Sequence, residues 1–307
     1  MTTNALNGRA FEWAIGLAVV NRTSFKIVKS SFSTNAEIAY NQLAIKKRDE
    51  FNIAAKVAIE HIFEKEKLRF PKGCLGEIQF NTDSAGQNGD VRDVLIKTGK
   101  FEFGISCKTN HDALKHSRLS GQLDFVRKWM LDENGCSDAY WGKVKPIFNE
   151  LAQIKRETKG TEIWENVDKK AERFYWPILY AWADELERLC GNNNPKADKV
   201  CAALISYLLG KHDFYKVMSF AKDKTVAIQA FNFGGSLATQ KTKYPDHIYQ
   251  ISDKNGGVYS KTVVLNHGYS INFRIHSASS RVEPSLKFDV RAISFPSNEI
   301  YQQTLNY

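Results

Sequence analysis

The sequence predicts an α+β fold, with a mixed sheet flanked by helices and a β-rich C-terminal region. Three changes of pattern along the 307 residues predict it. Helical periodicity dominates up to about Phe70, a strand-rich stretch ends at Lys108, and helical patterns return up to about Leu209. From about 213 to 294, β-branched and aromatic residues alternate with other residues, which is typical of strands.

Helices account for the first and third stretches. A helical pattern covers Arg9–Val20, and the capping-box sequence over 34–37 (TNAE) opens a long amphipathic pattern up to Phe63. The segment 191–195 (GNNNP) is a clear break within the third stretch.

Strands account for the second and fourth stretches. We expect strands over Glu77–Phe80, Asp93–Lys97 and Phe101–Lys108, the last two joined by a turn at Gly99. The C-terminal strand patterns lie at 225–233, 247–252, 261–266, 270–276 and 286–294. We therefore divide the chain into a helical and core region, 1–210, and a β-rich region, 211–307, which can also pack as one domain.

The composition indicates a folded protein of the reducing cytoplasm. No apolar run approaches the roughly 18 residues of a membrane span, and the N-terminus lacks the basic start of a signal peptide. The five cysteines are odd in number, widely spread and form no Cys-x-x-Cys pair. Neither a disulfide framework nor a zinc site is therefore predicted, and we expect a cytoplasmic protein without a membrane partner.

The formal net charge of +9 favours a polyanionic partner, because each phosphate neutralised by Lys or Arg releases counterions. The same surplus also serves solubility alone, and it says nothing about chemistry. Charge by itself therefore leaves nucleic-acid binding and simple solubility equally open.

The predicted hairpin brings an acid and a lysine together. Side chains alternate faces along a strand, so Ser106 and Lys108 share a face and Asp93 on the neighbouring strand can point to the same side. A carboxylate with backbone carbonyls and waters forms an oxygen-rich site that suits Mg²⁺. An adjacent lysine can stabilise a phosphoryl transition state, or orient and deprotonate a water. Acids and lysines at strand ends are also ordinary surface residues, so the spacing alone leaves both interpretations open.

Polar and basic residues follow the hairpin. We expect a helix that begins near Asp112. One side of this helix start is predicted to carry Asn110, His111, Lys115 and Arg118. A helix N-terminus beside a row of donors suits a scissile phosphate and its neighbours. The alternative is a solvated charged face without a ligand.

The hairpin resembles the PD-(D/E)xK nuclease core, with Asp93 at the position of the first acid and Lys108 at the lysine. The longer string over 89–120, GDVRDVLI…FGISCKTNHDALKHSRLS, is similar to the HaeIII-type family of type II restriction endonucleases, and so is FRIHSASSRVEPSLKFDV over 273–290. The resemblance implies a restriction-endonuclease-like fold and Mg²⁺-dependent cleavage of unmethylated double-stranded DNA at GGCC, with 5′-phosphates and blunt ends. Nothing in composition or spacing points to that target.

Ser106 departs from the motif, because it stands where the second acid is expected and a hydroxyl is a poorer Mg²⁺ ligand than a carboxylate. We rank Glu12 first as the replacement, since related cores often use a glutamate of the first helix, and Glu77 and Asp90 next. Glu12 can instead be a first-turn acid that interacts with the helix dipole. Glu102 is disfavoured as a ligand of the same metal, since it lies six residues from the lysine, about 20 Å along a strand.

The catalytic set implied by the resemblance is therefore Asp93, Lys108 and Glu12. Asp93 and Glu12 are expected to bind the metal together with the backbone carbonyl of Cys107. The Cys107 side chain should point into the core, away from the faces of its two neighbours, and no partner histidine supports a nucleophilic cysteine.

Recognition of the DNA sequence is expected from the C-terminal region, which holds 12 Lys and Arg against 7 Asp and Glu. G·C pairs present O6 and N7 acceptors that Arg and Lys read best, so we assign base contacts to Arg274 and Arg281. Further hydrogen-bonding and basic groups come from Ser279, Ser280 and Lys287. The alternative is that the basic side chains contact the DNA backbone or protect a sheet edge.

Two competing functions stay open. One is a non-catalytic basic DNA-binding module with the hairpin as scaffold, and the other is a structure-specific repair nuclease with the same core. A palindromic target suggests two-fold symmetry, but a homodimer and a monomer that cuts one strand at a time are both compatible with the sequence.

Overall fold

The computed structural model describes residues 3–71, 73–82, 89–99, 101–109, 113–253, 259–277 and 279–307. The chain forms two compact units, each built from segments that are distant in the sequence. Unit 1 comprises Met1–Asp112, Gly210–Lys243 and Ser297–Tyr307, and unit 2 comprises Ala113–Leu209 and Tyr244–Pro296. Residue 210 is one of the points where the chain passes between units, while the division into 1–210 and 211–307 stays a prediction.

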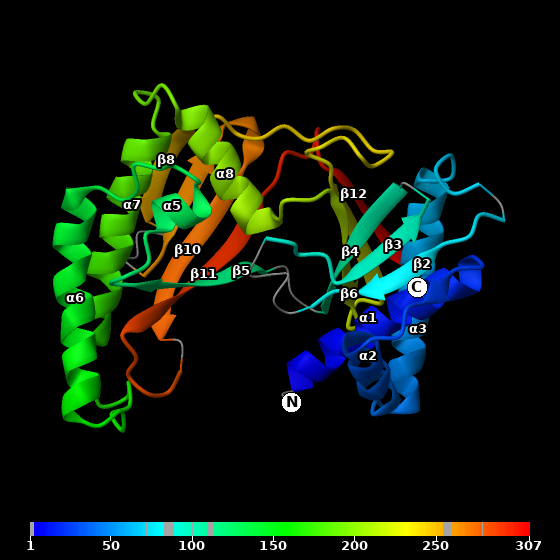
Figure 1. The fold of residues 1–307 in the computed structure, drawn as a ribbon, viewed down its shortest axis with the longest axis horizontal. Helices are drawn as coiled ribbons and strands as arrows, with labels where there is room; N and C mark the ends of the chain where they lie inside the picture. The colour runs from blue at the N-terminus through cyan, green and yellow to red at the C-terminus, as the bar shows by residue number, and fades with distance from the viewer. Residues whose placement is uncertain are drawn as a thin grey trace. The chain divides into compact units, whose positions relative to one another are not determined.

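Unit 1 is a mixed sheet with helices packed on it (Figure 1). Its elements are α1 (Thr3–Arg22), β1 (Lys26–Ile27), α2 (Ser31–Asn41), α3 (Ile45–Lys65), β2 (Glu77–Phe80), β3 (Val94–Thr98), β4 (Phe101–Thr109), β6 (Phe214–Phe220), β7 (Thr225–Phe231) and β12 (Tyr301–Asn306). The strand order is β1-β2-β3-β4-β6-β7-β12. β1 pairs with β2 and β4 with β6 in parallel, and the other neighbours are antiparallel. The predicted α+β class is confirmed.

Helices α1 and α3 cover one face of this sheet and bury an aromatic core. Phe11 of α1 and Phe51 of α3 have ring centroids 5.2 Å apart, and Phe103 of β4 packs 6.0 Å from Phe63. Phe103 is also 5.8 Å from Tyr215 of β6. These contacts pack α1 on α3 and α3 on β4, the strand that carries Lys108, and α1 also packs directly on β4.

A buried carboxylate fastens the end of α3 to the same sheet. Glu66, directly after α3, accepts hydrogen bonds from the Tyr215 hydroxyl at 2.7 Å and from the Ala238 N–H at 2.8 Å. Its second oxygen lies 2.9 Å from the guanidinium of Arg69. A fully buried charge is tolerated only with such partners, so these groups fix α3 relative to β6.

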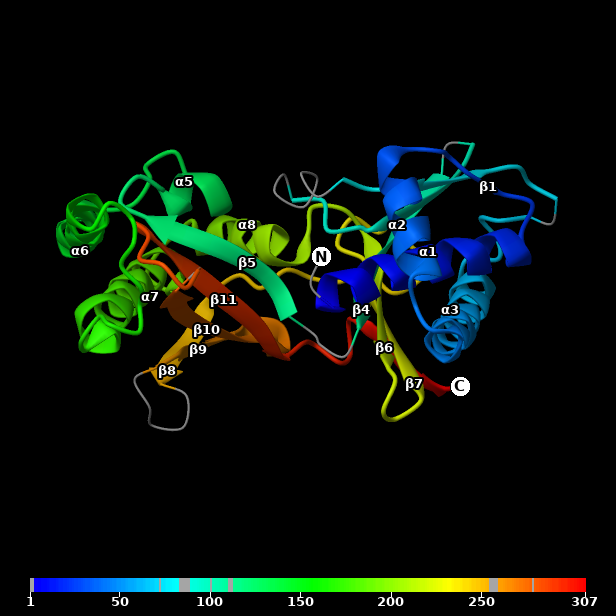
Figure 2. The ribbon, with the colours of Figure 1, turned by 90° about the horizontal axis from the view of Figure 1, so that it is seen from below.

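Unit 2 is an antiparallel five-stranded sheet with helices packed on one face (Figure 2). Its elements are β5 (Ala113–Ser120), α5 (Phe125–Trp129), α6 (Asp138–Glu157), η1 (Ala171–Tyr175), α7 (Trp176–Cys190), α8 (Ala197–Leu209), β8 (Ile248–Asp253), β9 (Lys261–Leu265), η3 (Asn266–Gly268), β10 (Ser270–Ser277) and β11 (Ser285–Ser294). The strand order is β5-β11-β10-β9-β8. The predicted β-rich C-terminal part is confirmed, with its strands shared between both units.

The helix predicted after the hairpin is wrong for residues 113–120. They form β5, which pairs antiparallel with β11 from Ser120↔Ser285 to His116↔Asp289. Basic residues at helical spacing favoured a helix, but pairing with a strand more than 160 residues further along the chain overrides that local preference.

The capping box predicted at 34–37 lies four residues earlier. The Ser30 N–H donates to the Ser33 hydroxyl at 2.8 Å, and the Ser33 N–H donates to the Ser30 hydroxyl at 3.1 Å. The long amphipathic pattern divides into α2 and α3, whereas the predicted break over 191–195 falls between α7 and α8. No helix in the described segments has the length and apolar character that a membrane crossing requires.

A buried arginine crosses β4 beside the hairpin. The Arg92 guanidinium donates to both oxygens of Asp90, at 2.7 and 2.8 Å, and to Glu102 at 2.7 Å. A Cβ atom on Gly104 would lie 2.2 Å from Cδ of Arg92 and 2.7 Å from its Cβ. Glycine at this position therefore leaves the space that the arginine fills, and the ion pairs hold the segment leading into Asp93.

We expect Gly104→Ala to lower the free energy of unfolding by about 1–3 kcal/mol, because the added methyl group displaces the buried Arg92 side chain. Gly142→Ala in α6 is the matched control, since its Cβ would meet nothing within 4 Å. Alanine is favoured over glycine by about 1 kcal/mol in a helix, so the control should be slightly stabilised. Urea unfolding followed by circular dichroism measures both variants, and equal stabilities would contradict the packing described.

Candidate active site

The hairpin of β3 and β4 brings Asp93, Ser106 and Lys108 together. Asp93 directly precedes β3, and its N–H donates to the Ile105 carbonyl at 2.8 Å, so backbone pairing places the acid. Its Oδ2 accepts a hydrogen bond from the Cys107 N–H at 2.6 Å. The same oxygen accepts from the Ser106 hydroxyl and the Lys108 ammonium, each at 3.3 Å. The predicted juxtaposition is therefore present, and its catalytic role stays a prediction.

The ion pair of Asp93 and Lys108 is half-buried. Burial by itself lowers the pKa of Lys108, but the attraction of Asp93, the largest opposing effect, leaves that pKa above its usual value. Lys108 therefore keeps its ammonium form, which can stabilise negative charge that develops on a bound substrate.

Glu12 adds a second carboxylate from α1, which packs against β4. Burial first, and then repulsion by Asp93, raises the pKa of Glu12 to about 8, against the opposing effects of Arg9 and Lys108. The Arg9 guanidinium lies 3.1 Å from Glu12 Oε2. Glu12 is therefore close enough to both hairpin residues to interact with their charges.

The other candidate acids have different surroundings. Asp90 is held by Arg92, as described above. Glu77 is exposed in β2, where it pairs in register with Lys97 and accepts from Gln79 at 3.4 Å. An electrostatic interaction with Asp93 is found for Glu12, which favours Glu12 as the acid that accompanies Asp93.

Cys107 contributes through its backbone. Its side chain is buried in the core of unit 1, as the strand alternation predicts. Burial, followed by repulsion from Asp93 and Glu12, raises the pKa of the Cys107 thiol well above its usual value. A buried neutral thiol is inert, so a nucleophilic role for this cysteine is not supported.

The donor set around Asp93 suits a hard divalent cation. Within the described ranges, no three His, Cys, Asp or Glu side chains gather into a metal-binding group. Mg²⁺, however, is commonly held by one or two protein carboxylates while it keeps several waters. Asp93 and Glu12 supply two carboxylates, and a cation between them would offset the burial and repulsion that raise the pKa of Glu12. These residues therefore fit Mg²⁺, with the Cys107 carbonyl as the predicted additional donor.

The residues predicted to bind DNA belong largely to unit 2. Arg118 of β5 and Lys287 of β11 are direct partners in the sheet register, so they share a face. Asn110 and His111 lie outside the described residues, and the side chain of Lys115 does too, although its backbone is in β5. The prediction that one helix face carries these groups is wrong from residue 113 onward, because residues 113–120 form β5.

The C-terminal candidates differ in their contacts. Arg274 of β10 forms an ion pair with Asp289 of β11 at 3.0 Å. The Ser279 hydroxyl donates to the Arg281 carbonyl at 2.8 Å, which shapes the exposed turn. The Ser280 carbonyl accepts from a backbone N–H at 3.0 Å, so this serine is held by its main chain. The base-reading roles of these residues stay predictions.

The sequence did not indicate that Lys216, a buried residue of β6, lies next to the candidate site. The parallel register of β4 and β6 places it directly beside Ser106. More than 100 residues separate the two positions, so no local pattern signals their pairing. The segment FYKVMSF falls within the stretch from about 213 where strands are expected, but nothing in it identifies the strand beside it.

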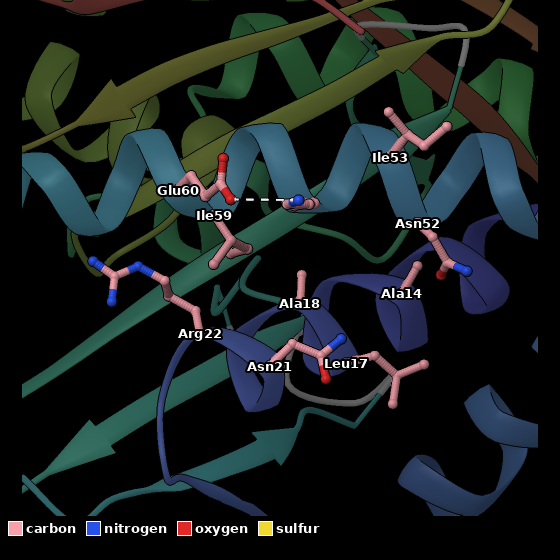
Figure 3. Close-up of a pocket in the computed structure, with 10 residues that line it drawn as sticks. Ala14, Leu17, Ala18, Asn21, Arg22, Asn52, Ile53, Ile59 and Glu60 are labelled. Carbon is pink, nitrogen blue, oxygen red and sulfur yellow. Dashed lines mark ion pairs between the residues drawn. The ribbon is translucent and has the colours of Figure 1, made fainter. Parts of the chain in front are cut away.

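A pocket of about 480 Å³ also lies in unit 1, between α1 and α3 (Figure 3). Leu17 and Asn21 line it from α1, and Lys56 and Glu60, 3.9 Å apart, line it from α3. At 3.6 residues per turn, Leu17 and Asn21 lie on the side of α1 roughly opposite Glu12. The pocket is therefore separate from the Asp93 cluster.

Comparison with known proteins adds an independent observation. Residues 8–296 match the family model described as HaeIII restriction endonuclease. The type II restriction enzyme HaeIII of Haemophilus aegyptius is 31% identical over 315 residues, which cover 97% of this chain and 96% of that enzyme. No solved structure matches the chain. The matched segment contains Glu12, Asp93 and Lys108.

Proposed function

We propose that this chain, which belongs to the HaeIII restriction endonuclease family, cleaves double-stranded DNA at GGCC in a Mg²⁺-dependent reaction that leaves 5′-phosphates and blunt ends. Family membership makes it a type II site-specific deoxyribonuclease that acts on DNA. The cluster of Asp93, Lys108 and Glu12 carries the catalytic assignment. The target and the form of the ends rest on the family resemblance.

Each residue of the cluster has a distinct chemical task in this proposal. Asp93 and Glu12 would hold Mg²⁺, which when bound stabilises charge on a phosphoryl oxygen and lowers the pKa of a water. The Cys107 N–H, 2.6 Å from Asp93 Oδ2, orients the Asp93 carboxylate. Lys108 presents its ammonium group to the charge that develops on the phosphate. A water attacks the phosphorus in line, and the bond to the 3′ oxygen breaks, which leaves the phosphate on the 5′ end.

The remaining expectations concern assembly and location. Two-fold symmetry of the proposed target supports a homodimer, and a monomer that nicks each strand in turn is the alternative. All five cysteines are free, which fits the reducing cytoplasm expected from the sequence.

Digestion of DNA of known sequence tests the proposed function directly. With Mg²⁺, linear duplex DNA should yield discrete bands whose ends map to GGCC, and without it the same DNA should stay intact. A mobility shift without any cleavage would identify a DNA-binding module. Cleavage confined to branched or damaged substrates would identify a structure-specific nuclease.

Asp93→Ala should lower the cleavage rate by at least ~100-fold, because a metal-stabilised transition state loses several kcal/mol without this carboxylate. Binding of the target duplex should remain close to that of the wild type, since the base and phosphate contacts are elsewhere. Cleavage within an order of magnitude of the wild-type rate would contradict the assignment of Asp93.

Lys108→Ala should slow the chemical step in single-turnover assays by at least ~100-fold, the size expected for a positioned charge-stabilising group. Arg118→Ala should instead weaken binding and reduce the slope of log affinity against log salt by about one. If Lys108→Ala altered only the salt slope, this lysine would be a phosphate contact and not an active-site residue.

Glu12→Gln should cripple Mg²⁺-dependent turnover, whereas Ser106→Ala should be tolerated. The reason is that Glu12 supplies the carboxylate that the Ser106 position lacks. Mg²⁺ titrations of cleavage in Glu12→Gln, with Glu77→Gln and Asp90→Asn as matched controls, measure the effect. If Glu12→Gln kept the wild-type Mg²⁺ dependence while Glu77→Gln or Asp90→Asn lost cleavage, the metal-binding role would pass to the residue changed in that variant.

A further inference from the structure

One face of the unit 2 sheet carries a cluster of basic side chains around a carboxylate. Lys287, Asp289 and Arg291 alternate along β11 with buried apolar residues, so all three point to the same face. The register places Arg118 of β5 opposite Lys287, and Arg274 of β10 opposite Asp289. Four cationic side chains therefore gather around one acid on three adjacent strands.

Helices cover the opposite face of the same strands. Trp182 of α7 packs 4.5 Å from Phe273 and 4.7 Å from Phe288, measured between ring centroids. Trp129 of α5 packs 5.7 Å from Phe288. Phe273 and Phe288 are each the sequence neighbour of a residue in the basic cluster. The cluster therefore lies on the face of the sheet opposite the helices. Arg118 and Arg291 are exposed on that face.

Asp289 organises the two arginines beside it. Its Oδ2 lies 3.0 Å from Nη2 of Arg274 and 3.6 Å from Nη2 of Arg291, and its side chain is only 5% exposed. A buried carboxylate needs cationic partners, so it restrains both guanidinium groups. Each guanidinium has five N–H donors, and an ion pair through one nitrogen leaves others for a ligand. Restraint of a long side chain before binding lowers the entropy lost on binding.

We propose that this face reads guanine bases in the duplex DNA target, with Arg274 and Arg291 as the base-contacting residues and Asp289 as a positioning residue. Arg118 and Lys287, on the same face, contact phosphates. Charge complementarity selects DNA as the occupant, and the paired arginines match the O6 and N7 acceptors of guanine. The inference rests on the proposed function and extends it to the residues that select the target.

The experiment compares affinities for a GGCC duplex and for the same duplex with the site scrambled. Fluorescence anisotropy of the full chain is measured with Ca²⁺ in place of Mg²⁺, so that binding is read apart from cleavage. Variants are Arg274→Ala, Arg291→Ala and Asp289→Asn. Arg188→Ala is the matched control, because the two arginines have similar surroundings. Arg188 is 49% exposed and lies 2.8 Å from the buried Glu185, and Arg274 is 48% exposed and lies 3.0 Å from the buried Asp289.

The ratio of target to scrambled affinity should fall by about tenfold or more in Arg274→Ala and Arg291→Ala, and stay unchanged in Arg188→Ala. Asp289→Asn removes a negative charge, so a purely electrostatic surface would bind both duplexes more tightly. A positioning role instead predicts a lower ratio in this variant. Arg274→Lys and Arg291→Lys should keep the wild-type affinity for scrambled DNA but lower the ratio of target to scrambled affinity. These lysine variants decide the result if an alanine variant fails to fold.

An unchanged ratio in the arginine variants would overturn the assignment of base contacts. An equal loss of affinity for both duplexes is one such result. Wild-type protein that binds both duplexes equally would overturn it as well. Wild-type protein that cleaves no DNA contradicts the proposed function, whereas cleavage at GGCC with an unchanged ratio in the variants contradicts this inference alone.

Discussion

The hydrogen bond from the Cys107 N–H to Asp93 is the constraint on which the candidate site depends. It joins an acid that precedes β3 to the backbone of β4, so the register of the hairpin decides where Lys108 lies. A slip of one residue would turn the lysine to the opposite face of the sheet. β6 on the far side of β4 and the ion pairs of Arg92 both resist such a slip.

The parts of the site that are close in the sequence were predicted, and the parts that meet through folding were not. Asp93, the turn at Gly99 and Lys108 lie within 16 residues, so strand periodicity and turn chemistry suffice to place them on one hairpin. The assignment of Glu12 to the site required the family resemblance, because nothing in the sequence of the first helix shows that this helix packs on β4. β5 was predicted as a helix, and the pairing of β6 with β4 was not anticipated, because distant strands supply the hydrogen bonds in both cases.

Buried carboxylates in both units have partners of positive or donor character. In unit 2, Asp289 is paired with arginines, and in unit 1 Glu66 accepts from its donors. Glu12 is the exception, since it is buried near a second carboxylate and its pKa is raised to about 8. Asp289 and Glu66 are thus stabilised by partners that the fold supplies. An acid left in an unfavourable field marks a place where a bound cation would improve stability.

The last strand of unit 1 has a consequence for synthesis in the cell. β12 completes the sheet by pairing with β7, yet it follows every segment of unit 2 along the chain. A ribosome releases the chain from its N-terminus, and domains generally fold as units once their segments are available. The strands of unit 2 therefore all leave the ribosome ahead of residues 301–306. The strand that completes the sheet of Asp93 and Lys108 is thus the last to leave the ribosome, so assembly of this sheet cannot finish until synthesis has ended.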